Sequence, residues 1–354
     1  LYVCLNTYLG GAGDEFGRSL DVDTSGNIYV TGLTRSTEFP ITLGAYDITL
    51  NSANGTYDIF VTKFNRSASS IIYSTLIGGS SVDESTGIKV SQDGTAIVCG
   101  ATSSIDFPRV NNSQIKKNGL DGIVFGLDPT GSSLKFSTFL GGDFDDKIED
   151  IILDNKDTIY LVGSTNSNNF PISLNVLQST YMGGEDGFIT KLNPNGNSIS
   201  SSTFLGGNSN DKAISICFAL NGDVCVAGKT ESSNFPTKNG YRLTPIAGED
   251  CYLVRLNRQL NVVNYGTYFG GANQEEPSSI CADSLNNIFI SGWTNSSDFP
   301  NLPASGIGNW FLIKFNSLVG IPSLEYSRMV GNINSALTTT MKCNSLGNSF
   351  VCGS

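Results

Sequence analysis

Acidic residues recur at one fixed place along this chain, where their carboxylate oxygens could bind a hard cation such as Ca²⁺. Each lies four residues after a Gly-Gly pair: Glu15, Asp83, Asp146, Asp211 and Glu275. The alternative is that each carboxylate accepts hydrogen bonds from backbone N–H groups of its own loop. Structural devices repeat in every copy, whereas binding sites usually differ between copies, so we favour the hydrogen-bonding role. We expect no cofactor and no catalytic residue, and we keep a Ca²⁺ site at these acids as the alternative.

Further acids gather in one loop, at Asp143, Asp145, Asp146, Glu149 and Asp150. Two carboxylates can act as acid and base in glycoside hydrolysis. Lys147 lies among these acids, and the sequence sets no separation between them, so we interpret the segment as a solvated loop. Four more aspartates open one strand of successive repeats, where we expect them to bond nearby backbone: Asp58, Asp121, Asp186 and Asp250.

Two other features are typical of sugar-binding propellers. The segment Ser91-Gln92-Asp93-Gly94-Thr95 resembles the Asp-box turn of sialidase propellers. It occurs once and lacks the expected aromatic residue, so we interpret it as an ordinary hairpin turn. Trp293 and Trp310 are aromatic residues of the kind that bind sugars, but a tryptophan wedged between sheets is the more common arrangement.

Four N-x-S/T sequons are candidate glycosylation sites: Asn54, Asn65, Asn111 and Asn295. A chain so rich in Asn, Ser and Thr acquires such sequons by chance. Three of them nevertheless fall in long loops that we expect to be exposed, where they would carry glycans if the protein is exported.

The composition excludes several classes of function. The chain has no histidine, so it contains neither a Ser–His–Asp site nor a Cys–His site. Its formal net charge of −11 argues against a nucleic-acid partner, which requires clustered Lys and Arg. No apolar stretch approaches the ~18 residues needed for a transmembrane segment. Because the chain begins at Leu1, we expect a mature or excised piece of a protein.

The eight cysteines do not suggest a disulfide framework. Five of them lie inside predicted strands, where other repeats carry apolar residues: Cys99, Cys217, Cys225, Cys281 and Cys343. Cys217 and Cys281 occupy the same repeat position on neighbouring sheets, roughly 9–10 Å apart and beyond disulfide range. We therefore expect free, mostly buried thiols.

A repeat explains all these placements. A strand-end glycine recurs at positions 10, 78, 141, 206, 270 and 331, and a second glycine recurs at 32, 100, 163, 228, 292 and 353. Both series advance by 68, 63, 65, 64 and 61 residues. Two independent landmarks with the same irregular spacing indicate a true repeat of about 64 residues.

Each repeat predicts four short strands, A to D, because period-two alternation is closed by Gly or Asn-Gly turns. Strand A is expected over 19–22, 88–90, 150–153, 215–218, 279–282 and 339–343, and strand D begins with 2–9. The A–B turn carries Gly, Asn or Asp where a left-handed residue is needed. The B–C loop carries a Phe-Pro pair in five repeats, which predicts that the ring is tucked against the sheet.

Stacking such units around an axis buries both faces of each sheet, which predicts a single all-β propeller domain over 1–354. It would have six four-stranded blades, at about 12–77, 80–140, 143–205, 208–269 and 272–330, closed by 333–354 plus 1–11. The closing blade is shared by the two termini and lacks strand C, so we expect the chain to have been cut there.

The motifs S-T-F-L-G-G, D-x-x-G-N-I-Y-V-T-G, S-S-x-F-P and D-G-F-I-T-K-L-N resemble the SBBP ("seven-bladed β-propeller") repeats of bacterial and archaeal surface or secreted proteins. The resemblance covers essentially the whole chain. The repeat near residue 331 lacks Gly-Gly, Asn309-Trp310 replaces the acidic start of strand C, and the chain supports six blades instead of seven.

From these patterns we expect an extracellular or cell-surface protein that is not an enzyme, acting as a non-catalytic binding or scaffold module. Its partner would be a glycan or a protein, bound at the face formed by the D–A and B–C loops. One alternative is a structural subunit that assembles with its own copies into a surface layer or filament. A second alternative is a carbohydrate-active propeller enzyme.

Overall fold

The computed structural model describes residues 7–52, 55–111, 119–246, 248–300, 309–316, 323–332, 339–344 and 348–353. All regular structure in these residues is β-strand. None of them belongs to a helix that is long and apolar enough to cross a membrane.

The chain divides into two compact units, and each is described by itself. Unit 1 comprises Leu1–Leu161, Ser167–Pro171 and Lys191–Ser200. Unit 2 comprises Val162–Asn166, Ile172–Thr190 and Ser201–Ser354.

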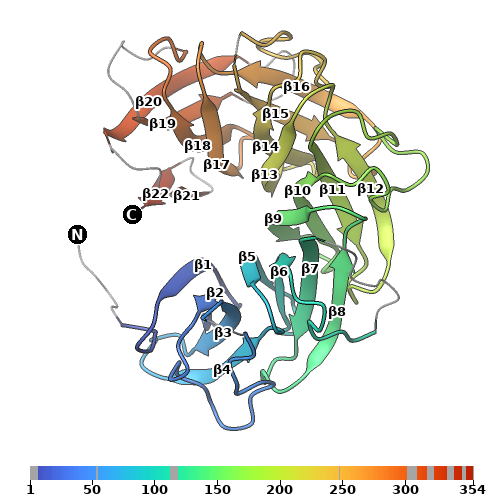
Figure 1. Cartoon of the computed structure of the whole chain (residues 1–354). Helices are drawn as coiled ribbons and strands as arrows, with labels where there is room; N and C mark the ends of the chain where they lie inside the picture. The colour runs from blue at the N-terminus through green and yellow to red at the C-terminus, as the bar shows by residue number, and fades with distance from the viewer. Residues whose placement is uncertain are drawn as a thin grey trace. The chain divides into compact units, whose positions relative to one another are not determined.

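Unit 1 contains two complete antiparallel sheets, in which sequential strands are neighbours (Figure 1). The first is β1 (Glu15–Val22), β2 (Ile28–Thr34), β3 (Asp58–Phe64) and β4 (Ile71–Ile77). The second is β5 (Asp83–Val90), β6 (Ala96–Thr102), β7 (Asp121–Leu127) and β8 (Leu134–Leu140). A third sheet has residues in both units, with β9 (Asp146–Leu153), β10 (Ile159–Thr165), β11 (Asp186–Leu192) and β12 (Ile199–Leu205) in the same order.

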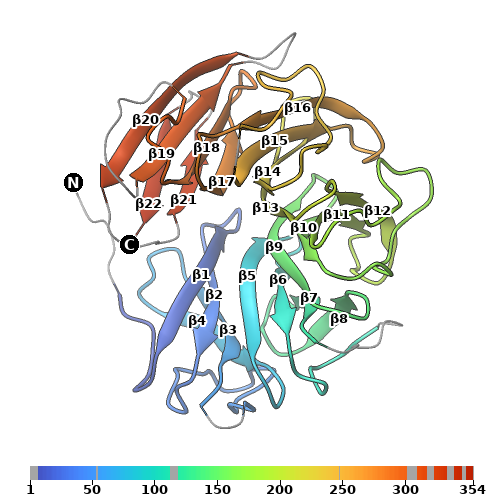
Figure 2. The same cartoon turned by 45° about the horizontal axis from the view of Figure 1, so that its top comes forward.

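Unit 2 contains two further four-stranded sheets (Figure 2). One is β13 (Asp211–Phe218), β14 (Val224–Thr230), β15 (Asp250–Leu256) and β16 (Val263–Phe269). The other is β17 (Glu275–Ala282), β18 (Ile288–Thr294), β19 (Asn309–Phe315) and β20 (Leu324–Asn332). A two-stranded sheet, β21 (Thr339–Cys343) and β22 (Ser349–Gly353), follows.

The prediction of an all-β propeller is confirmed by this repeated four-stranded arrangement. The described residues form five four-stranded sheets and one two-stranded sheet, so the blade count approximately fits six. The expected strand over 2–9 falls largely on residues 1–6, which lie outside the described part, and residues 7–9 form no strand. The residue boundaries of the blades stay a prediction.

Strand A begins earlier than the sequence pattern indicates. In β5 it starts at Asp83, whereas the alternation starts at Ile88. The register between β5 and β6 shifts between Ser85 and Gly87, and β13 shifts in the same way. A β-bulge adds one residue and interrupts the alternation, so the pattern reveals only the part of the strand that follows the bulge.

Two predicted local features are confirmed. The A–B turn residues have positive φ at all five described positions: Gly26, Gly94, Asp157, Gly222 and Asn286. The Phe-Pro rings are all at most 3% exposed: Phe39, Phe107, Phe170, Phe235 and Phe299. Three of the rings stack on an aromatic ring of strand C, which is β3, β15 or β19. The ring centroids are 4.7 Å apart for Phe39 and Phe60, 4.1 Å for Phe235 and Tyr252, and 4.6 Å for Phe299 and Phe311. These aromatic contacts hold the long B–C loops against the sheets.

The glycine of strand B allows strand A to lie close to it, which gives a test of the fold. A Cβ at Gly100 would lie 1.8 Å from the backbone oxygen of Glu84, an overlap that only a backbone shift can relieve. We expect Gly100→Ala to lower the free energy of unfolding by about 2–3 kcal/mol, measured as a lower urea midpoint. Gly17→Ala is the matched control, because nothing lies within 4 Å of its Cβ position. Equal midpoints for the two variants would contradict the close approach.

Candidate functional site

The five acids that follow the Gly-Gly pairs each begin a strand and accept a hydrogen bond from their own loop. The donor is always the backbone N–H of the second glycine. The distances are 3.2 Å for Gly11 to Glu15, 2.7 Å for Gly79 to Asp83, 2.6 Å for Gly142 to Asp146, 2.6 Å for Gly207 to Asp211 and 3.0 Å for Gly271 to Glu275.

Hydroxyl groups at the end of strand B complete the environment of each acid. Ser104 Oγ donates to Asp83 at 2.9 Å, and Thr102 donates to its other oxygen. Ser232 Oγ donates to Asp211 at 2.7 Å. These contacts are the ones expected if each acid accepts hydrogen bonds within its own loop. Within the described residues, no group of three or more His, Cys, Asp or Glu is placed to hold a metal ion, and Ca²⁺ binding stays a prediction.

The aspartates that open strand C (β3, β7, β11 and β15) lie beside the acids that open strand A. The sequence did not reveal this proximity. A Cβ at Gly206 would lie 2.5 Å from Asp186 Oδ1 and 3.0 Å from Asp211 Oδ2, so both carboxyl groups approach the same glycine. The same arrangement joins Asp58 to Asp83 at Gly78 and Asp250 to Glu275 at Gly270. Three of these aspartates also accept from the preceding loop: Asp58 from Asn51 N–H at 2.7 Å, Asp186 from Met182 N–H at 2.8 Å and Asp250 from Ile246 N–H at 2.9 Å.

Burial dominates the electrostatics of these carboxyl pairs. The pKa of Asp83, Asp186 and Asp211 is raised to about 6, mainly by burial, and the neighbouring carboxylate contributes to the rise for Asp83 and Asp186. Oδ1 of Asp186 is buried without a hydrogen-bond partner in the described part of the chain. The charged forms of these groups are therefore disfavoured.

The other acidic candidates are not brought together. Asp146 is buried in its hydrogen-bond network, whereas Asp143 and Asp145 are exposed and Glu149 is half-buried. Asp145 accepts from Leu120 N–H at 2.8 Å. Lys147 lies 3.6 Å from Glu149 and 3.9 Å from Glu84. Ion pairs and backbone contacts thus account for this loop.

The sequons and tryptophans have local structural contacts. Asn65 and Asn295 are half-buried, and Asn295 Oδ1 accepts from Gln274 N–H at 2.8 Å. Asn111 is exposed, and its amide donates to the Lys135 carbonyl at 2.9 Å. Asn54 lies outside the described residues, so its use, like that of the other sequons, stays a prediction. Trp293 and Trp310 face each other across β18 and β19.

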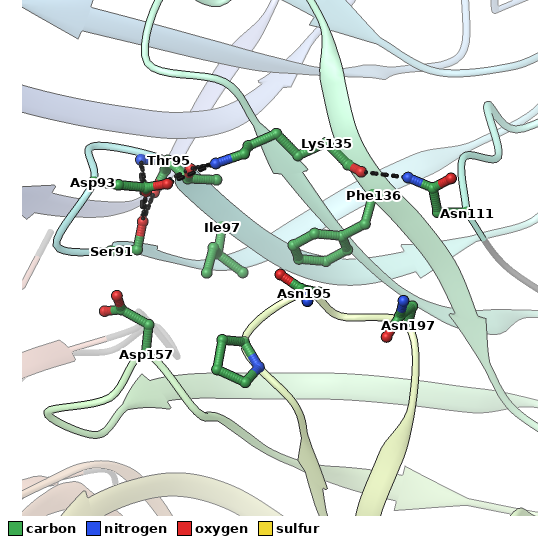
Figure 3. A pocket seen from close by; sticks show the side chains of 11 residues that line it. Ser91, Asp93, Thr95, Ile97, Asn111, Lys135, Phe136, Asp157, Asn195 and Asn197 are labelled. Carbon is green, nitrogen blue, oxygen red and sulfur yellow. Dashed lines mark hydrogen bonds and ion pairs between the residues drawn. The ribbon is translucent and has the colours of Figure 1, made fainter.

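A cavity of about 340 Å³ lies in unit 1, at turns that join strands A to B and strands C to D (Figure 3). We call it the Lys135 pocket. It is lined by Ser91, Asp93, Thr95, Ile97, Asn111, Lys135, Phe136, Asp157, Pro194, Asn195 and Asn197. Its volume lies within the range of ligand pockets. The expected binding face was instead the one formed by the D–A and B–C loops, which stays a prediction.

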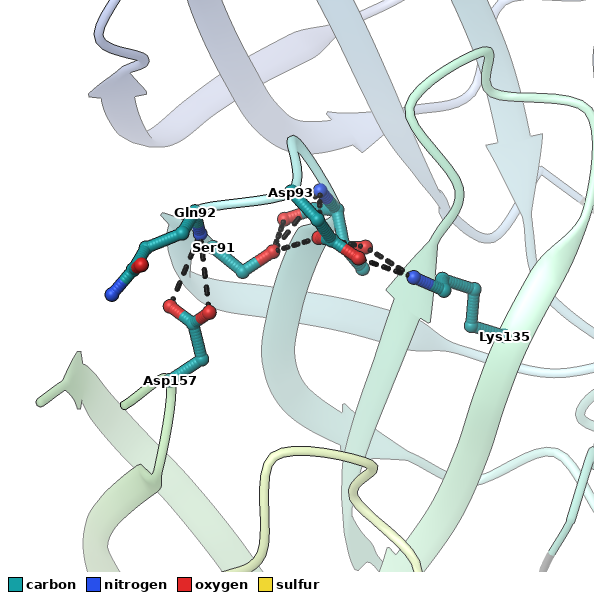
Figure 4. Close-up of polar contacts among 6 residues, drawn as sticks. Ser91, Gln92, Asp93, Lys135 and Asp157 are labelled. Atoms are coloured by element: carbon teal, nitrogen blue, oxygen red, sulfur yellow. Dashed lines mark hydrogen bonds and ion pairs between the residues drawn. The ribbon is translucent and has the colours of Figure 1, made fainter. Parts of the chain in front are cut away.

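The segment that resembles an Asp box supplies one wall of the pocket through a fixed network. Asp93 accepts from Ser91 Oγ at 2.6 Å and from Thr95 N–H at 3.0 Å. Lys135 Nζ donates to Asp93 Oδ2 at 2.6 Å and to Thr95 Oγ1 at 3.0 Å (Figure 4). The ammonium of Lys135 holds the pKa of Asp93 well below its usual range. The carboxylate is therefore ionised and oriented at neutral pH.

Asp157 forms the opposite side of this wall. Its carboxylate accepts from Gln92 N–H at 3.1 and 3.3 Å (Figure 4). Gln92 Nε2 donates to the Asn155 carbonyl at 2.7 Å. The apolar residues Ile97 and Phe136 are at most 3% exposed, so they form the base beneath a polar surface. A pocket that presents carboxylates, an ammonium group and amides suits a ligand with many hydroxyl groups.

Comparison with known proteins identifies the repeat and the fold. The family model of SBBP, a beta-propeller repeat, matches residues 7–40 and 264–300, which confirms the resemblance seen in the sequence. No curated protein matches the chain in sequence.

Three solved structures share the fold. A protein of unknown function from Dyadobacter fermentans DSM 18053 has a TM-score of 0.55 at 10% identity, covering 98% of this chain and 95% of its own. A polysaccharide lyase, PL25 ulvan lyase bound to -[GlcA(1-4)Rha3S]-, has a TM-score of 0.51 at 10% identity. The alignment covers 95% of this chain and 78% of the lyase. A second PL25 ulvan lyase structure has a TM-score of 0.50 at 11% identity, and the alignment covers 97% of this chain and 79% of the lyase.

These structures correct the expectation of a non-catalytic binding or scaffold module. A polysaccharide lyase shares the fold, so a propeller of this kind does not support a non-catalytic role. Function depends on the residues of the site and not on the fold. Identities of 10–11% show the fold alone, and the separate expectation that this chain is not an enzyme stays a prediction.

The buried carboxyl pairs predict an unusual dependence of stability on pH. The pKa of Asp83, Asp186 and Asp211 is raised to about 6 in the folded chain. Their stabilising effect is therefore complete below the unfolded pKa near ~4 and is lost as pH rises through about 6. We expect the Tm at pH 5.5 to exceed the Tm at pH 7.5 by ~3 °C or more, measured by circular dichroism.

Asp186→Asn is the control that separates this effect from the net negative charge of the chain. Asparagine keeps an acceptor for Met182 N–H but does not titrate, so the Tm difference between the two pH values should shrink. A wild type with equal Tm at both pH values would contradict the role of the carboxyl pairs. So would an Asp186→Asn variant that keeps the full difference.

Proposed function

Because the chain is a β-propeller that carries SBBP repeats, we propose that it binds a glycan in the Lys135 pocket of unit 1. The observation that carries the proposal is the pairing of a cavity of about 340 Å³ with a polar, prearranged wall. Donors and acceptors that are already held in place lose little freedom when they bind a sugar.

The contacts around Lys135 support this assignment. Its ammonium has three N–H donors, and the described residues supply two acceptors, Asp93 and Thr95. The Lys135 side chain is 45% exposed, so solvent or a ligand hydroxyl can reach it. Asn195 and Asn197 point toward the Lys135 and Phe136 side of the cavity (Figure 3). Amides in such positions can both donate to and accept from sugar hydroxyl groups.

A protein partner, or assembly with further copies of the chain, is the competing proposal for this surface. Protein interfaces usually have an apolar core, whereas the accessible lining of the Lys135 pocket is polar. The glycan is therefore the better match to the pocket.

We also propose an extracellular or cell-surface location. The support is the likeness to repeats of surface and secreted proteins, together with the exposed sequon at Asn111. Because Asn111 lines the pocket, a glycan attached there would lie at the edge of the binding site.

The test is a glycan array with neutral, amino and acidic oligosaccharides, followed by calorimetry on the ligands that bind. We expect Lys135→Ala to weaken binding by tenfold or more, equivalent to about 1.4 kcal/mol. Lys147→Ala is the matched control, since Lys147 is a surface lysine of unit 1 outside the pocket.

The same samples show whether a bound glycan is cleaved, because products can be followed by chromatography. Binding that is unaffected by Lys135→Ala, or an array without any bound glycan, would contradict the proposal. Cleavage by the wild type that is lost in Asp93→Asn would assign the pocket a catalytic role in addition to binding.

A further inference from the structure

Four thiols of unit 2 lie on strands of three sheets. Cys217 and Cys225 are cross-strand partners within one hairpin of β13 and β14. Cys281 lies on β17, and Cys343 lies on β21. All four are free thiols in the structure, as the sequence predicts.

Strand β21 packs directly against β17. Ser279 Oγ donates to the Met341 carbonyl at 3.3 Å and accepts from Met341 N–H at 3.1 Å. Cys281 and Cys343 each follow two residues after these contacts. Because successive side chains of a strand alternate between its faces, the two thiols repeat the orientation of Ser279 and Met341.

The two thiols also belong to one apolar cluster. Cys343 packs against the cluster formed by Cys281, Phe289 and Met341. The two thiols are near enough for each to shift the pKa of the other.

We propose that Cys281 and Cys343 form a disulfide in oxidising surroundings, which ties β21 covalently to β17. The sheet of β21 and β22 has only two strands among the described residues, and a two-stranded sheet is marginal without packing. A bond to the complete sheet of β17–β20 fastens it.

The chemistry follows from the unequal environments of the two thiols. The neighbouring Cys343 thiol and burial raise the pKa of Cys281, which keeps this thiol protonated. Cys343 is half-buried, whereas Cys281 is buried. Cys343 is therefore the attacking sulfur, and Cys281 is the resolving one.

The oxidant is a low-molecular-weight disulfide such as oxidised glutathione. The Cys343 thiolate attacks one sulfur of the reagent, its S–S bond breaks, and one reagent thiolate leaves. Cys281 then loses its proton to solvent and attacks Cys343 Sγ, which releases the second reagent thiolate. The protein loses two electrons and two protons in total, and the reagent is reduced to two thiols.

The test is to incubate the full chain with oxidised glutathione, quench it in acid, alkylate under denaturing conditions and map the peptides by mass spectrometry. We expect a peptide containing Cys281 joined to one containing Cys343. Two of the eight cysteines should escape alkylation. The Tm of the oxidised chain should exceed that of the reduced chain by about 5 °C.

Variants identify the pair. Cys343→Ser and Cys281→Ser should each abolish the link and the Tm increase, whereas Cys217→Ser should leave both unchanged. Fragmentation of the linked peptide distinguishes Cys343 from Cys352, which shares its tryptic peptide. A link between Cys217 and Cys225, a link through Cys352, or eight alkylated cysteines in the oxidised wild type would overturn the proposal. If a serine variant does not fold, the map of the wild type alone decides.

Discussion

The hydrogen-bonded carboxylate at the start of each strand A is the interaction on which the repeat depends. In β5, Asp83 joins the Gly79 N–H of the incoming loop to the Thr102 and Ser104 hydroxyls at the end of β6. A single side chain thereby fixes the entry into one strand and the exit from its neighbour. Because both oxygens are used in this way, the loop can be short and glycine-rich without fraying.

This arrangement brings a second carboxyl group into the same region and so has an electrostatic cost. Asp58 lies across Gly78 from Asp83, and Asp186 lies across Gly206 from Asp211. A side chain at either glycine would overlap both carboxyl groups, which explains the strand-end glycine better than turn geometry does. The raised pKa values of about 6 for Asp186 and Asp211 show that burial outweighs the hydrogen bonds these groups accept.

The sequence was sufficient for features whose cause is local and repeated. A left-handed residue in the A–B turn requires Gly, Asn or Asp, so Asp157 and Asn286 could be recognised from residue type alone. The β-bulge of strand A was not recognised, because it removes the alternation that reveals a strand. The pairing of Asp186 with Asp211 was also missed, since it joins strands of two different sheets, β11 and β13, with β12 between them in the chain.

The Lys135 pocket could not be assembled from the sequence because its walls come from distant segments, such as Asp93 and Asn197. A signal was nevertheless present in the way the repeats differ. At the strand D position of Lys135, the other four-stranded sheets carry Ile72, Ser200, Asn264 and Glu325. Asn264 donates to Asp223 at 3.0 Å, so a contact between strand D and the A–B hairpin also occurs in the sheet of β13–β16.

In the sheet of β5–β8, the contact between strand D and the A–B hairpin joins two charged side chains, Lys135 and Asp93, and both remain partly exposed. Lys135 and Asp93 are 45% and 58% exposed, whereas Asp223 is almost buried beside Arg255. An exposed ion pair contributes little stability, so stability alone does not explain the Lys135–Asp93 pair. The Lys135–Asp93 pair departs from the repeat at the position where a cavity opens, and a departure of this kind distinguishes a binding site from a structural device.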